Sequence, residues 1–129
     1  EGRRYMPGVK DWLKKASSDL KASKKLSDDF ETFDCSVFHT HQCAEKSLKA
    51  FIVLAQKAIP KTHDLGLLLD YCIGINNEFL LLQQESKNLD SYGYASRYPN
   101  DAFYADEKIV EEAIEMAEKI LITVKNKIR

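Results

Sequence analysis

Glycine, proline and cysteine are scarce in this sequence, with five Gly, three Pro and three Cys among 129 residues. Folds with many strands need more turn residues than this, so the composition argues against an all-β protein. The three cysteines form no CxxC motif, and such a sparse, odd set does not make a disulfide framework. It indicates a protein of the reducing cytoplasm.

Long apolar runs and an excess of charge are also missing. The apolar runs are only a few residues long, too short to cross a membrane, and the first residues have no apolar segment typical of a signal peptide. We therefore expect a cytoplasmic protein that is not bound to a membrane. The net charge of −1 argues against a strongly basic protein that coats nucleic acids.

The composition that remains is that of one folded domain. Hydrophobic residues make up 44% of the sequence and charged residues 30%, which is typical of a globular protein. A chain of this length buries enough surface to form a core without metal or disulfides. We expect a single domain over residues 1–129.

Apolar residues recur at spacings of three and four residues, as on one face of a helix. No segment outside the loop described below alternates as a strand would. The sequence therefore predicts an all-α fold, an antiparallel up-and-down bundle of four to five helices. The expected helices run from Val9 to Leu26, from Asp28 to Ala58, from Thr62 or Asp64 to Gly74, from Asn76 or Asn77 to Leu89, and from Asp106 to Ile128, with an ordered loop over Ser91–Asp106.

Charge is distributed unevenly between the first and last helices. Residues 9–25 contain six Lys and two Asp, whereas residues 105–118 contain six acidic residues and one Lys. If these two helices pack side by side, their faces attract each other. We favour this interpretation over a nucleic-acid-binding patch.

The second predicted helix carries a polar stripe of four residues, His39, Gln42, Lys46 and Lys49. At 100° per residue the stripe lies opposite an expected core face. This face consists of Phe33, Val37, Ala44, Leu48, Phe51 and Ala55. The stripe either faces a second subunit, lines a cleft, or is simply exposed to solvent.

The other histidines and the cysteines suggest no metal or catalytic site. His41 lies at the edge of the core, and His63 lies at a helix start after Pro60, so structural roles are favoured for both. Cys35, His39 and Cys43 have a spacing that could ligate zinc, but a fourth ligand is not evident. We expect neither a metal nor a cofactor, and no cysteine nucleophile.

Arg97 is the only arginine away from the chain ends, and it lies in the predicted loop among aromatic residues. An arginine grips phosphate with a planar fork, and tyrosines can stack on bases. The loop therefore suits a nucleotide or RNA. The alternative is that Arg97 pairs with a carboxylate while the rings pack on the end of the bundle. The aromatic residues are Tyr92, Tyr94, Tyr98, Phe103 and Tyr104.

Four motifs together resemble the HEPN domain, the nucleotide-binding domain of higher eukaryotes and prokaryotes. They are Trp12 with Ala16 and Asp19-Leu20, the segment FHTHQCAEKSLKAF over residues 38–51, Thr62-His63-Asp64-Leu65, and Arg97-Tyr98-Pro99. The resemblance covers Trp12 to Ile122. It implies a helical homodimer linked to nucleotides or RNA. It also implies a minimal nucleotidyltransferase as partner, as in a toxin–antitoxin-like system.

Members of this family that act as ribonucleases carry a His four to six residues after an Arg. No His follows Arg97 within that interval. We therefore expect a non-catalytic module that binds a nucleotide or phosphate through Arg97, Tyr98 and the polar stripe of the second helix. The alternatives are a ribonuclease with an atypical site, in which folding brings His39 near Arg97, and a dimerisation module without a ligand.

Overall fold

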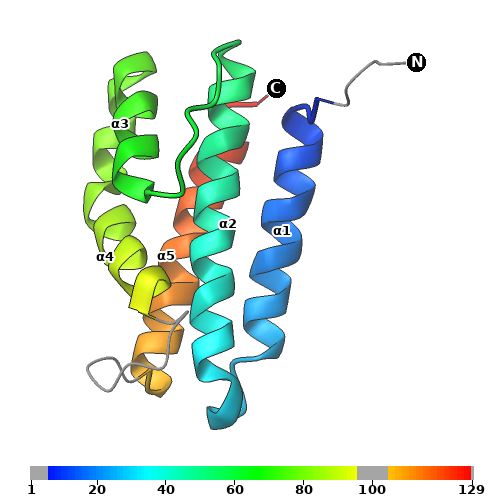
Figure 1. The fold of residues 1–129 in the computed structure, drawn as a ribbon, viewed down its shortest axis with the longest axis vertical. Coiled ribbons are helices and arrows are strands. Elements are labelled where there is room, and N and C mark those ends of the chain that lie inside the picture. Colours follow the sequence, from blue (N-terminus) through cyan, green and yellow to red (C-terminus); the bar gives the residue numbers. More distant parts are fainter. Residues whose placement is uncertain (1–5, 96–104, 129) are drawn as a thin grey trace.

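The computed structural model describes residues 6–95 and 105–128, which form an antiparallel bundle of α-helices (Figure 1). This part of the chain contains no strand, and the predicted all-α fold is confirmed. The α-helices are α1 (Val9–Lys25), α2 (Phe33–Leu54), α3 (Leu65–Ile75), α4 (Gln83–Ala95) and α5 (Glu107–Lys125), and two 3₁₀ helices, η1 (Phe30–Thr32) and η2 (Asn77–Leu82), precede α2 and α4.

The central element is α2, which lies between α1 on one side and α3, α4 and α5 on the other (Figure 1). Val37, Ala44, Leu48 and Phe51 are buried, as the periodicity predicts, whereas Phe33 and Ala55 at the ends of the helix are partly exposed. Cys43, Ser47 and Ala50 are buried as well. The helix is therefore buried over more of its circumference than one face, whereas the sector that carries His39, Gln42, Lys46 and Lys49 stays partly exposed.

Helix α1 packs against α2 along one edge of the polar stripe. Its buried residues Ala16, Leu20 and Ser23 repeat at helical spacing, and most are small, so the two helices approach closely. The Ser36 hydroxyl of α2 donates to the Ser23 carbonyl over 2.7 Å. The polar stripe of α2 lies beside α1 and stays partly exposed, so a second subunit as its neighbour remains a prediction.

Two predicted helices differ from the observed ones at their ends. The second was expected over Asp28–Ala58, but α2 begins only after η1 and ends at Leu54, because Gln56 adopts a left-handed backbone with φ 60°. The fourth was expected to start at Asn76 or Asn77. There the chain first forms η2, since the Asn76 side chain accepts from the Glu78 amide over 3.0 Å. Helix α4 then continues to Ala95 and takes up the first part of the predicted loop.

Acidic residues cap α3 and α5, as the sequence suggests. The Asp64 carboxylate accepts from the Leu67 amide over 3.2 Å, and the Asp106 carboxylate accepts from the Ile109 amide over 2.8 Å. Each bond satisfies an amide that has no partner within its own helix. The two caps fix the residues at which these helices begin.

In the described part of the chain, the helices are too short or too polar to cross a lipid bilayer.

The attraction predicted between the first and last helices amounts to one ion pair among these residues, in which Lys24 of α1 lies 3.4 Å from Glu118 of α5. An exposed pair of this kind contributes little stability.

Candidate functional site

A polar cluster joins α1 to α2 around the buried carboxylate of Asp19. His39 Nδ1 lies 2.9 Å from Asp19 Oδ1, and Lys46 Nζ donates to Asp19 Oδ2 over 2.7 Å. Lys46 also donates to Gln42 Oε1 over 3.2 Å. Three of the predicted site residues, His39, Gln42 and Lys46, are therefore brought together, and we call this group with Asp19 the Asp19 cluster.

The Asp19 cluster is less cationic than the sequence suggests, because the carboxylate offsets the charge of Lys46. A carboxylate can only accept, so the contact sets His39 Nδ1 as the donor. The His39 side chain is 32% exposed. This arrangement orients an imidazole at the surface, in the manner of a positioned acid or base.

A second cluster forms around Glu45, which is buried in α2. Glu45 Oε2 accepts from Lys49 Nζ over 2.7 Å and from His63 Nδ1 over 2.8 Å. Burial raises the pKa of the Glu45 carboxyl, but the hydrogen bonds from Lys49 and His63 outweigh it, so the pKa lies below 4.5. Lys49 Nζ also lies 5.4 Å from the centre of the Trp12 ring, a cation–π contact with α1.

The Glu45 cluster therefore separates Lys49 from the other residues of the predicted stripe. Lys49 is held by a carboxylate of its own helix, as Lys46 is held by one of α1. The structural role predicted for His63 is confirmed, because its bond to Glu45 ties the segment after Pro60 to α2.

The buried ring of His41 connects α2 to α4. His41 Nε2 lies 3.3 Å from Asp90 Oδ1, and the same oxygen accepts from the Leu65 amide over 3.0 Å. On its other side, His41 Nδ1 lies 3.9 Å from Glu45 Oε1. Gly93 of α4 makes room for the ring, since a Cβ there would lie only 2.2 Å from His41 Cδ2. The structural role predicted for His41 is confirmed.

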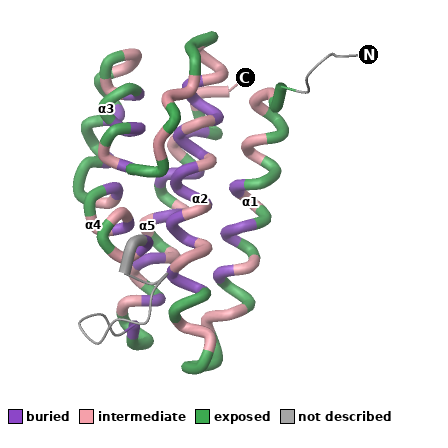
Figure 2. The backbone as a smooth tube through the Cα atoms, in the orientation of Figure 1, coloured by how far each residue is buried: buried purple, intermediate pink, exposed green. Residues whose placement is uncertain are grey.

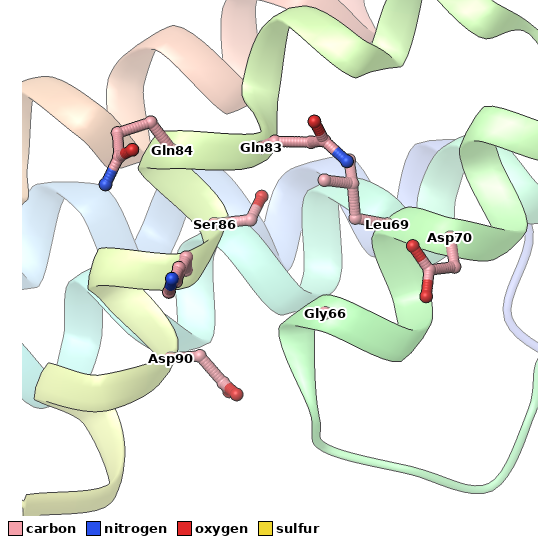
Figure 3. Close-up of a pocket in the computed structure, with 8 residues that line it drawn as sticks. Gly66, Leu69, Asp70, Gln83, Gln84, Ser86 and Asp90 are labelled. Atoms are coloured by element: carbon pink, nitrogen blue, oxygen red, sulfur yellow. The ribbon is translucent and has the colours of Figure 1, made fainter.

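A polar cleft of about 450 Å³ opens between α3 and α4 (Figure 3). The carboxylates of Asp70 and Asp90 come from different helices, with Gly66 between them (Figure 3). The Ser86 hydroxyl is buried, and within the described residues it has no hydrogen-bond partner. No predicted site residue lines the cleft, whose walls are Gly66, Leu69, Asp70, Gln83, Gln84, Ser86, Lys87 and Asp90.

Of the three residues that raised the question of zinc, Cys35 is exposed, and Cys43 and His39 contact different neighbours. Cys43 Sγ lies 4.0 Å from the Ala117 carbonyl of α5, whereas His39 is bonded to Asp19 of α1. Burial raises the pKa of the Cys43 thiol to about 12, so it does not supply a thiolate at neutral pH. Among the described residues, no cluster that could hold a metal ion forms around them.

Arg97 and Tyr98 lie outside the described residues. Helix α4 ends at Ala95, just before them, and the description resumes at Ala105. The distance between His39 and Arg97, on which the atypical ribonuclease depends, is therefore not given by the structure.

The carboxylates at the centres of the clusters, Asp19, Glu45 and Asp90, were not predicted. Glu45 had a usable signal, because it lies four residues from both His41 and Lys49, the spacing of ion pairs on a helix. For Asp19, the only signal in the sequence was its place in the motif of Trp12, Ala16 and Asp19-Leu20. Asp90 had none, because its contacts with His41 and Leu65 depend on how α4 docks.

Known proteins resemble the chain in sequence and in structure. The family model of the HEPN domain matches residues 9–127. An archaeal HEPN homologue of known structure is 28% identical, with a TM-score of 0.77, and the match covers 96% of this chain and 100% of that one. A protein from Thermus thermophilus is 26% identical with a TM-score of 0.75, covering 95% and 100% of the two chains. No curated protein matches the sequence.

Proposed function

The chain belongs to the HEPN domain family, and from this premise we propose that it is a non-catalytic module that binds an anionic nucleotide or RNA. The observation that carries the proposal is the sequence after Arg97, which has no His within four to six residues. A 2′-hydroxyl attack on RNA needs a group that takes or gives a proton at that place. Without that group, Arg97 and the tyrosines around it in the sequence are suited to bind RNA or a nucleotide but not to cleave RNA.

Arg97 is the principal phosphate contact in this proposal, and Tyr98 stacks on the base. A bidentate arginine is specific for phosphate because its two parallel N–H groups match two oxygens. His39 and Gln42 line the same site. Lys46 and Lys49 contribute less than the sequence suggests, because Asp19 and Glu45 already hold their ammonium groups at 2.7 Å.

The proposal includes two protein partners. One is a second copy of the chain in a homodimer, and the other is a protein with a minimal nucleotidyltransferase domain, as in a toxin–antitoxin-like system. Support for both comes from the family. The stripe of α2 that first suggested a dimer lies beside α1 and stays partly exposed.

Calorimetric titration with ATP, GTP and a short RNA tests the binding function. Loss of one charge-assisted contact costs about 1.5–3 kcal/mol, so Arg97→Ala should weaken binding by roughly 10- to 150-fold. Arg97→Lys keeps the charge without the fork and should restore only part of the affinity. If wild type binds none of these ligands, or Arg97→Ala binds as tightly as wild type, the proposal fails.

One observation favours a second candidate function, an atypical ribonuclease. Asp19 orients His39 at the surface, and an oriented imidazole can serve as general acid or base. We expect little or no cleavage of single-stranded RNA by pure protein. Efficient cleavage that both His39→Ala and Arg97→Ala abolish would favour this candidate over the binding module.

A further inference from the structure

Four lysines form a row along the outer face of α1. Lys10, Lys14, Lys21 and Lys25 are all exposed, and their spacings of four, seven and four residues place them on one side of the helix. This side lies opposite the buried residues Ala16, Leu20 and Ser23. Figure 2 shows the exposed side of α1 turned away from α2. We call the four residues the lysine row.

The charges of the lysine row are not neutralised by other described residues. None of the four lies within 4.0 Å of a described carboxylate, and the neighbouring Lys24 makes the ion pair between α1 and α5. This differs from α2, where Asp19 and Glu45 hold Lys46 and Lys49. The free positive charge of this side of the molecule is therefore on α1 and not on the stripe of α2.

We propose that the lysine row binds the phosphodiester backbone of single-stranded RNA. From Lys10 to Lys25 the row spans 16 residues of helix, about 22 Å, which is long enough to meet several successive phosphates. Mobile ammonium groups on a straight helix suit a backbone better than a base edge, so the contact carries no sequence preference. The inference rests on the proposed function, since it extends the same ligand chemistry to a second surface.

The packing of α1 argues against a membrane as the partner. A helix that binds a bilayer buries its apolar side among the lipids. The apolar side of α1 is already buried against α2 and α5. Only electrostatic attraction would remain for a lipid surface.

The inference predicts a specific dependence on salt. Each phosphate neutralised on a single strand contributes about −0.7 to the slope of log affinity against log salt. Four lysines therefore account for a slope of about −3. This corresponds to a loss of about 50-fold in affinity between 50 and 200 mM salt.

Fluorescence anisotropy with a labelled single-stranded 20-mer RNA, from 50 to 200 mM NaCl, tests the row in the full chain. The variant K10Q/K14Q/K21Q/K25Q should bind more weakly at 50 mM, and its slope should be about 3 units shallower. The matched control K57Q/K87Q/K108Q/K125Q removes four exposed lysines from other segments. It should keep the wild-type slope. Glutamine is a good helix former, so both variants should keep the wild-type circular dichroism.

Several outcomes would overturn the inference. They are a row variant that binds like wild type, an equal loss in the control variant, and the absence of RNA binding by wild type at 50 mM. DNA of the same sequence should bind comparably, and a failure to do so would exclude a simple backbone contact. Row-dependent binding to phosphatidylserine vesicles without RNA binding would assign the surface to a membrane.

Titration with ATP and GTP separates this inference from the proposed function. A mononucleotide is too short to span the row, so the row variant should keep its mononucleotide affinity, whereas Arg97→Ala should lose it. If the protein binds mononucleotides and its RNA binding does not depend on the lysine row, the inference about the row is refuted and the proposed function stands. Row-dependent RNA binding that Arg97→Ala leaves unchanged, without mononucleotide binding, would refute the proposed site and leave the row.

Discussion

Gly93 is required where α4 crosses the ring of His41. An alanine Cβ would lie 2.2 Å from His41 Cδ2, so either the ring or the helix must move. We expect Gly93→Ala to destabilise the protein by about 1–3 kcal/mol, although alanine is the better helix former. Gly74→Ala is the control, because nothing lies within 4 Å of its added Cβ. It should stabilise by up to about 1 kcal/mol in urea unfolding. Equal effects of the two changes would contradict this role of Gly93.

Glu45 makes the free energy of unfolding depend on pH in the acidic range. Its pKa in the folded protein is lowered below 4.5, chiefly because Lys49 and His63 donate to it against the effect of burial. The stabilisation is therefore complete above pH 4.5 and is lost as the pH falls through the lower folded value.

Urea unfolding at several pH values measures this effect. Glu45→Gln should be less stable than wild type at neutral pH, and the difference should shrink below pH 4.5. Glu115→Gln removes an exposed carboxyl of α5 and should follow the wild-type curve. A constant difference between Glu45→Gln and wild type at every pH would contradict the prediction.

At the scale of elements, Asp19 is the polar link between α1 and α2. Asp19→Ala removes the acceptor of both His39 and Lys46 and leaves Lys46 partly buried without its carboxylate. We expect a loss of about 1.5–3 kcal/mol in the free energy of unfolding. Asp28→Ala, an exposed site in the turn after α1, should change stability by less than about 0.5 kcal/mol. Similar losses in the two variants would show that the contacts of Asp19 with His39 and Lys46 add no stability beyond that of an exposed Asp.

The existence of the elements could be predicted from the sequence, but their contacts could not. Ala16, Leu20 and Ser23 mark the buried side of α1 by their spacing alone, because helical period and burial are local properties. The pairing of Asp19 with His39 depends on the angle at which two helices meet. The spacing of residues within one helix does not determine that crossing angle.

The ends of the elements were predicted closely where a carboxylate caps the backbone: α5 was expected from Asp106, and α3 from Thr62 or Asp64, of which Asp64 is the cap. They were missed where the backbone itself decides, as at Gln56 with its positive φ.

Of the predicted site, the structure gathers His39, Gln42 and Lys46 but separates Lys49 into the Glu45 cluster. The roles of Arg97 and Tyr98 stay predictions.

For the whole molecule, we expect a homodimer. Sedimentation velocity at tens of micromolar should give twice the mass of 14.8 kDa. The variant K10Q/K14Q/K21Q/K25Q should sediment as wild type does if the lysine row faces solvent in the dimer. A wild-type protein that remains monomeric would contradict the dimer, and a variant that changes mass would place the row in the interface.

The central place of α2, between α1 and the other helices, also determines how the molecule opens. We expect an outer helix such as α1 to open more readily than α2, because its contacts are chiefly with α2 and α5 whereas α2 contacts every other α-helix. The amides of α2 near Ala44 and Leu48 become accessible only when several helices separate together. We therefore expect their protons to exchange with solvent mainly through global unfolding, and those of α1 to exchange through smaller and more frequent openings.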